Sequence, residues 1–404
     1  MKHSSVTSPQ DKRGAIRSSA RSTLWFAWGF ALFWNAISSP IPFILPAELA
    51  SGNQLAWVAI IFPLVGVGLL AWAVRQTLNW RRFGSTLLHM DPFPGALGGD
   101  VGGTVELRLA YHSRYRFLVT LTCQHVTARR SKNGRQTVRE VKWQDEQLAE
   151  VHAGMYGTWL HFLFHPPGDL PESSEAGTAW DEWSIQISAD LPGIDFERSW
   201  EIPVFLNAGP QTARDRIRDY RIESSTQALS EKRVRIRETG EGVELYYPYL
   251  RHPGLALGTL LTGGGFVGFA WLFHALGEDG LSVLFIGLFA LAGGLILVWG
   301  LYLLGNSLRV TAGRQGLTTL RGLFGLRFAR HVDAGEITAI ERSIGMQASQ
   351  SSQSRAYYRI EVLTRDGRRI TAGTGIPGVS SVDAIIRRLE QALDLPGALE
   401  RGRR

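Results

Sequence analysis

The chain has 404 residues, enough for two or three domains, and 45% of them are apolar. Its formal net charge of +7 could indicate nucleic acid, but much of the basic excess lies beside apolar blocks or at the termini. An anionic membrane leaflet is the expected partner of such a distribution, so we expect no nucleic-acid binding. The single cysteine, Cys123, excludes an intrachain disulfide.

Four apolar segments are long enough to cross a bilayer as helices, which takes about 20 residues. They run 24–45, 55–74, 255–276 and 281–304, and none contains Lys, Arg, Asp or Glu. Three prolines, at 40, 42 and 46, predict that the outer end of the first is kinked or ends early. Short connections pair the segments into antiparallel hairpins at 23–76 and 254–304. The sequence therefore predicts an α-helical membrane protein with four transmembrane helices.

Basic residues are concentrated on one side of these segments. The short loops within the two hairpins carry Glu48, Glu278 and Asp279 but no Lys or Arg. The other ends are flanked by Arg21, Arg75, Arg81, Arg82, Arg251, Arg309 and Arg314. Because cytoplasmic loops carry the Lys/Arg excess, we expect a multi-pass cell-membrane protein with both termini and both soluble modules in the cytoplasm.

Residues near the predicted span ends are candidates for contact with lipid headgroups. The candidates are Arg81, Arg82, Arg251, Arg314 and Arg321. The simpler alternative is a solvated basic face beside an anionic membrane.

The last two segments are rich in glycine. Gly264 and Gly268 are four residues apart, a spacing that lets helix backbones approach closely. We expect them to pack within a four-helix bundle, with homo-oligomerisation as the alternative. Asn35 is the strongly polar residue deep in a span, and we expect it to form a hydrogen bond with a neighbouring helix.

Between the hairpins, residues 85–206 alternate between polar and apolar with regular turns, which predicts a β-sandwich. The predicted strands are 104–111, 117–126, 137–144, 157–164, 182–188 and 200–205. The carboxylates Asp145, Glu146, Asp181 and Glu182 follow tryptophans at predicted strand ends, so we expect them in solvated turns.

Histidine and cysteine residues in this region do not form a convincing site. His161 and His165 would lie about 13 Å apart along one strand, too far for one metal ion. Cys123 and His125 would share a face, but two more ligands would be needed from elsewhere, and a lone cysteine is usually a small buried residue. We therefore expect no metal, cofactor or catalytic residue.

The stretch 184–196 and the strand Trp200-Glu-Ile-Pro-Val-Phe205 together resemble arrestin-like sandwich domains, in which a strand, a Pro-Gly turn and a second strand follow in this order. Residues 92–103 and Trp143-Gln-Asp-Glu146 resemble bacterial membrane proteins that insert such a domain between two helix hairpins. This resemblance implies protein binding through sheet edges and loops rather than catalysis.

A second β-rich module is expected at 306–397. Its predicted strands are 308–311, 316–321, 326–332, 336–342, 357–364 and 368–372, with a polar loop at 347–354. A helix then begins with Ser380 at the cap position and carries Ile385, Ile386, Leu389 and Leu393 at helical spacing. Strands closed by one amphipathic helix resemble the pleckstrin-homology-like fold. That family includes phosphoinositide binders, and the nearest match to their basic loop is Arg314, Arg321, Arg327 and Arg330.

The remaining segments are a basic tail at 1–22 and a linker at 207–253 that contains a hairpin. Together these features predict a non-enzymatic scaffold or adaptor in the bacterial inner membrane, with lipids and unidentified proteins as partners. Two alternatives remain: a channel or transporter component, and a membrane-bound maturation factor acting where the modules meet the membrane.

Overall fold

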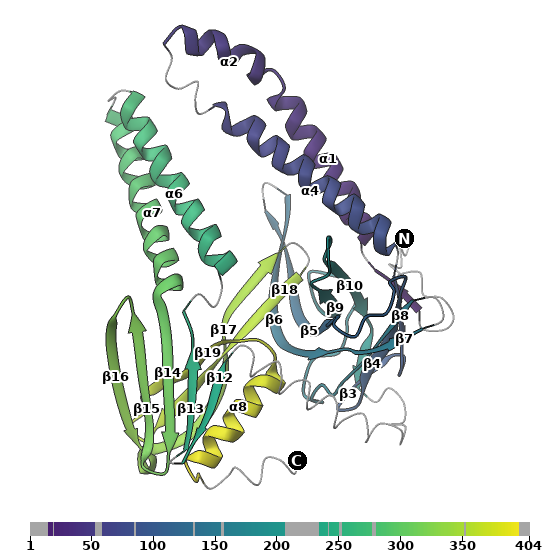
Figure 1. Cartoon of the computed structure of the whole chain (residues 1–404), viewed down its shortest axis with the longest axis vertical. Coiled ribbons are helices and arrows are strands. Elements are labelled where there is room, and N and C mark those ends of the chain that lie inside the picture. Colours follow the sequence, from purple (N-terminus) through teal and green to yellow (C-terminus); the bar gives the residue numbers. More distant parts are fainter. Residues whose placement is uncertain are drawn as a thin grey trace.

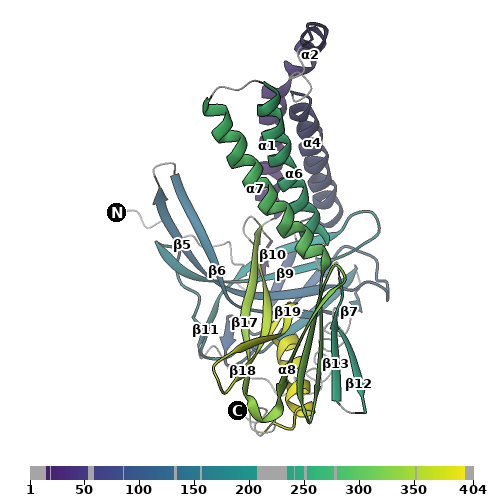
Figure 2. The ribbon, with the colours of Figure 1, turned by 90° about the vertical axis from the view of Figure 1, so that its left-hand side faces the viewer.

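The computed structural model describes residues 15–18, 20–52, 59–84, 86–131, 134–154, 157–206, 234–240, 242–249, 253–276, 280–350 and 353–395. Two helical hairpins leave the same end of a pair of β modules, and both views show this arrangement (Figures 1 and 2). One hairpin joins the sandwich and the other joins the C-terminal module (Figure 1).

The first hairpin consists of α1 (Ala20–Ser38), α2 (Ile41–Ala50) and α4 (Ile61–Phe83). The break between α1 and α2 lies at Pro40, as the prolines predict. Asn35 Nδ2 donates to the carbonyl of Gly66 on α4 over 3.0 Å, which confirms the expected bond between helices. Trp28 Nε1 also reaches α4, donating to Thr77 Oγ1 over 2.9 Å.

The second hairpin pairs α6 (Pro253–Leu276) with α7 (Gly280–Gly305). Among the described residues, three helical stretches are long and apolar enough to cross a membrane: Leu24–Ala50, Pro253–Trp271 and Val283–Gly305. These stretches indicate a membrane protein. The helix at the second predicted span, 55–74, has different bounds. Residues 55–58 lie outside the described part, and α4 continues past 74 to Phe83, with Arg75, Arg81 and Arg82 in its last turns.

The region 85–206 is a β-sandwich. One sheet has the order β1-β2-β4-β8-β7 and the other β10-β9-β5-β6. The strands of the first are β1 (Ala15–Arg17), β2 (Leu87–Met90), β4 (Val101–Leu107), β7 (Glu150–Ala153) and β8 (Thr158–Phe164). Those of the second are β5 (Leu118–Ser131), β6 (Gly134–Leu148), β9 (Ala179–Ala189) and β10 (Phe196–Ile202). A short parallel pair joins β3 (Gly95–Leu97) to β11 (Val204–Leu206).

Alternating residues of both sheets fill the core between them. Val105, Leu121, Leu160 and Ile185 are each 0% exposed, as expected for strands whose inner faces are apolar. Strand β1 comes from the segment predicted as a basic tail and pairs with β2, with Ile16 buried opposite Leu88.

The C-terminal module begins earlier in the chain than the sequence predicts. Its larger sheet has the order β12-β13-β14-β15-β16, with strands β12 (Arg235–Thr239), β13 (Gly242–Tyr247), β14 (Asn306–Gly313), β15 (Gly316–Leu323) and β16 (Leu326–Asp333). The hairpin assigned to the 207–253 linker is therefore part of this sheet, since β13 pairs with β14. The helix pair α6–α7 is inserted between two neighbouring strands of one sheet.

A second sheet and one helix complete the module. The sheet contains β17 (Ile337–Gln350), β18 (Gln353–Thr364) and β19 (Arg369–Ile376). The polar run 347–354, predicted as a loop, belongs to long strands apart from residues 351–352, which lie outside the described part. Helix α8 (Val379–Ala392) buries Ile385, Ile386 and Leu389 against the sheets, as its periodicity predicts.

Candidate interaction site at the junction of the two modules

Strand β6 of the sandwich packs against β18 and α8 of the C-terminal module, and this contact is called the junction here (Figure 1). Among the described strands of its own sheet, β6 is an edge strand that pairs with β5 alone. An uncovered edge presents free N–H and C=O groups that can pair with another chain. Here the C-terminal module covers that edge.

Two glutamines, one from each module, bond the backbone of the other module. Gln144 of β6 donates from Nε2 to the Ser354 carbonyl over 3.0 Å, and its Oε1 accepts from the Ala356 N–H over 2.8 Å. Gln347 of β17 does the reverse. It donates to the Arg139 carbonyl over 2.7 Å and accepts from the Val141 N–H over 3.1 Å. Each side-chain amide therefore donates to one backbone carbonyl and accepts from one backbone N–H of the facing strand, as the backbone of a neighbouring strand would.

The Tyr358 hydroxyl adds a contact to the same edge, since it accepts from the Gln144 N–H over 2.9 Å. Burial raises the pKa of Tyr358, so this hydroxyl stays neutral. Gln144 is 1% exposed and Tyr358 is 4% exposed. At such burial the loss of one partner leaves the other polar group unsatisfied.

Asp145 caps the N-terminus of α8 from the other module. Its Oδ1 accepts from the Ser380 N–H over 3.0 Å and from the Glu146 N–H over 2.9 Å, and its Oδ2 accepts from the Ser380 hydroxyl over 2.5 Å. The prediction that Ser380 caps this helix is wrong. Ser380 is the second residue of α8, and the N-cap residue is Gly378, which has no side chain to cap with.

Gly378 is required at this point for two reasons. Its φ of 78° lies in the left-handed region, and an added Cβ would lie 3.0 Å from the Glu146 nitrogen and 3.1 Å from Asp145 Oδ1. Any other residue here would have a strained backbone and would press on the carboxylate at the helix N-terminus.

The expectation that Asp145 and Glu146 lie in solvated turns is also wrong, since both belong to β6 and are 8% and 2% exposed. Burial raises the pKa of Asp145 to about 6, although the hydrogen bonds from Ser380 and Glu146 oppose the shift. Glu146 has a cationic neighbour, because Arg355 Nε lies 3.7 Å from its Oε1. The junction thus contains a buried carboxyl group whose ionisation is disfavoured by folding.

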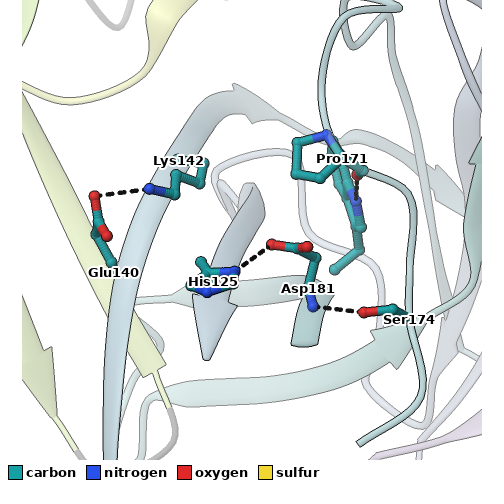
Figure 3. Close-up of polar contacts among 7 residues, drawn as sticks. His125, Glu140, Lys142, Pro171, Ser174 and Asp181 are labelled. Atoms are coloured by element: carbon teal, nitrogen blue, oxygen red, sulfur yellow. Dashed lines mark hydrogen bonds and ion pairs between the residues drawn. The ribbon is translucent and has the colours of Figure 1, made fainter. Parts of the chain in front are cut away.

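Asp181 and Glu182 lie within β9 rather than in turns. Figure 3 shows Asp181 between two partners: His125 Nδ1 lies 2.8 Å from its Oδ1, and its N–H donates to Ser174 Oγ over 2.8 Å. Lys142 and Glu140 form a separate ion pair of 2.9 Å in the same view. The bond from Asp181 to Ser174 holds the loop before β9 against the sheet.

The thiol of Cys123 does not fit a nucleophile or a metal ligand. Its side chain is 0% exposed, and burial raises its pKa to about 12. Among the described residues there is no group of three or more His, Cys, Asp or Glu able to hold a metal ion. His165 Nδ1 lies 2.7 Å from Asp100 Oδ1.

The candidate headgroup contacts are distributed differently from the prediction. Arg82 donates to the Pro192 carbonyl over 2.7 Å, so it anchors the Pro-Gly turn of the sandwich. Arg314 lies in the β14–β15 turn, at the end of β14 away from α7 and about 25 Å from it. Arg81 is exposed, Arg321 lies near the end of α7, and Arg251 lies outside the described residues.

Neither Gly264 nor Gly268 packs against another helix in the described part of the chain. A Cβ added at either would have no neighbour within 4 Å, whereas one at Gly263 would lie 2.9 Å from Leu297 and one at Gly293 would lie 2.8 Å from the Gly263 carbonyl. The predicted packing role is therefore wrong for Gly264 and Gly268 within the described chain, because the helix rotation turns the adjacent Gly263 toward α7. Homo-oligomerisation through Gly264 and Gly268 stays a prediction.

Comparisons with known proteins do not identify a family. No family model matches the chain, and no curated protein matches it. Among solved structures, the sporulation control protein Spo0M from Bacillus subtilis is similar at 13% identity and a TM-score of 0.21, over 61% of this chain and 87% of that one. A score this low carries no argument about function.

Proposed function

We propose that the protein is a membrane-anchored, non-enzymatic scaffold whose two β modules form one platform on the cytoplasmic side of four transmembrane helices. The observation that carries this proposal is the junction. Reciprocal glutamine bonds and the Asp145 cap hold the modules in one relative position, and each bond contributes about 1 kcal/mol. A fixed arrangement of two surfaces is what a scaffold needs.

Continuity between helices and sheets supports the same proposal. Phe83, the last residue of α4, is 3% exposed and its ring lies 5.1 Å from that of Phe196 in the sandwich core. Arg198 donates to Asn79 of α4 over 2.5 Å. At the other hairpin, β14 begins at the residue after α7 ends. The sandwich is thus fastened to α4 by packing, and the C-terminal module continues directly from α7.

The resemblance of the sandwich to arrestin-like domains favours one class of partner for this scaffold, a protein segment that binds at a sheet edge or loop. The edge of β6 is covered, and the other edge strand of this sheet is β10 (Phe196–Ile202), which pairs with β9 alone among the described strands.

The test is gentle-detergent purification of the tagged, crosslinked chain followed by mass spectrometry, with three variants side by side. The scaffold predicts a stoichiometric partner for the native chain and for the control Gln315→Ala, which changes an exposed glutamine away from the junction. The double variant Gln144→Ala/Gln347→Ala should lose that partner. A partner retained equally by all three would refute the role of the junction.

Ion flux in proteoliposomes separates the scaffold from the channel alternative. Flux carried by the purified native chain would overturn the proposal. Labelling of Ser51→Cys and Gly280→Cys from outside intact cells, with none at Arg314→Cys, is the expected topology, because Arg314 is exposed whereas native Cys123 is buried.

A further inference from the structure

The turn between β15 and β16 lies beside the end of α7. Asn306, the residue after α7, pairs with Leu323, the last residue of β15. The Phe324 ring packs over the final residue of the helix, since a Cβ added to Gly305 would lie 2.5 Å from it. Figure 1 shows the β15–β16 turn at the helix end of the sheet.

Apolar side chains at this turn are exposed. Phe324, Leu326 and Phe328 are 64%, 62% and 57% exposed, in a module whose other apolar strand residues are mostly buried. We call these three residues, with Arg321, Arg327 and Arg330, the tip patch. An exposed patch of large apolar side chains rimmed by cations marks an interaction surface.

The exposed Phe324 also has a backbone conformation that is unusual for a bulky residue. Its φ of 46° and the φ of 92° at Gly325 are those of a two-residue hairpin turn with both central residues left-handed. Asn, Asp or Gly is preferred at the first of these positions, and a bulky residue is unusual there. Phe324 therefore occupies a strained position without joining the core, which indicates a role outside the fold.

The level of the tip matches a membrane interface. Trp299 and Tyr302 stack at 5.5 Å on the last turns of α7, where aromatic side chains favour the headgroup region. Gly305 is three residues further on, about 4.5 Å along the axis. The span Val283–Gly305 ends at the same residue.

The charges of the tip patch fit an anionic surface. Arg321 lies opposite Phe328 across the β15–β16 pair, Arg327 opposite Gly322, and Arg330 opposite Thr319. Within the described part of the chain no carboxylate forms an ion pair with any of the three arginines. Basic groups at this level are attracted to anionic headgroups, while apolar side chains enter the acyl boundary.

We propose that the tip patch inserts Phe324, Leu326 and Phe328 into the headgroup–acyl boundary of the leaflet at the end of α7, with its arginines on anionic lipid phosphates. This contact fastens the C-terminal module to the bilayer at a second point besides the helices. It rests on the proposed function only in requiring that α7 cross the membrane.

The experiment measures the collision of a nitroxide label with oxygen, which concentrates in lipid, and with a water-soluble nickel complex. The full chain is reconstituted in vesicles of phosphatidylcholine and phosphatidylglycerol. The labelled variants are Leu326→Cys at the tip, Arg314→Cys at the opposite turn of the same sheet, and Val298→Cys on the exposed face of α7. The native chain, whose Cys123 is buried, is the labelling blank.

The expected oxygen-to-nickel ratio at 326 is several-fold higher than at 314 and falls towards the value at 314 when phosphatidylglycerol is omitted. A ratio at 326 equal to that at 314, with a lipid value at 298, would overturn this inference and leave the membrane span intact. Water exposure at 298 would overturn the span and the inference together. Phe328→Cys supplies an independent position if the first variant does not fold.

Discussion

Replacing Asp145 by asparagine should remove a pH dependence of stability that the junction creates. The pKa of Asp145 is raised by burial from 3.8 to about 6. Because the folded-state pKa lies above the unfolded value, folding favours the protonated form. The contribution to stability is therefore complete below pH 3.8 and is lost as the pH rises through about 6.

The size of the effect follows from the shift. Raising the pKa of Asp145 from 3.8 to about 6 corresponds to a free energy of unfolding lower by about 2–3 kcal/mol at pH 7 than at pH 4. In Asp145→Asn the carboxamide oxygen can still accept from the Ser380 and Glu146 N–H groups, but the side chain no longer ionises. We expect the variant to match the native chain at pH 4 and to be more stable at pH 7.

The assay is thermal unfolding in detergent, followed by near-ultraviolet circular dichroism between pH 4 and pH 8. The native melting temperature should fall across this range by several degrees more than that of Asp145→Asn. Ser380→Ala is the control, since it removes one hydrogen bond and leaves the carboxyl group in place, so its pH dependence should remain. Parallel curves for the native chain and Asp145→Asn would refute the reasoning.

Three further predictions concern other contacts. Gly263→Leu should destabilise the α6–α7 hairpin by several kcal/mol because the new side chain would overlap Leu297. Gly264→Leu should leave the melting temperature of the monomer in detergent unchanged, and equal effects of the two variants would contradict the packing described. Arg82→Ala should lower the free energy of unfolding by about 1–2 kcal/mol because the Pro192 carbonyl loses its donor, and Arg81→Ala should lower it by under about 0.5 kcal/mol. The rate of proteolysis at the 190–195 turn in the two variants measures the difference. Cys123 should react with a maleimide only after denaturation, because it is buried and its pKa is raised to about 12; rapid labelling of the folded chain would show otherwise.

Local patterns of sequence determined most elements. The strand predicted at 157–164 is β8 (Thr158–Phe164), and the predicted C-terminal helix is α8, because period-2 and period-3.6 patterns record which residues face a core. The bond between Asn35 and α4 was likewise predictable, since an amide in an apolar span needs a partner on another helix.

Contacts between distant segments were decided only by the tertiary structure. Asp145 and Glu146 are polar, so their pattern predicts solvent, and no local signal shows that a second module covers them. The cap of α8 comes from a residue 235 positions earlier in the chain, and the alternation of β13 does not reveal that its partner β14 follows two membrane helices. Periodicity states which face of a strand or helix is apolar. It does not state what covers the polar face, because that depends on how separate modules pack.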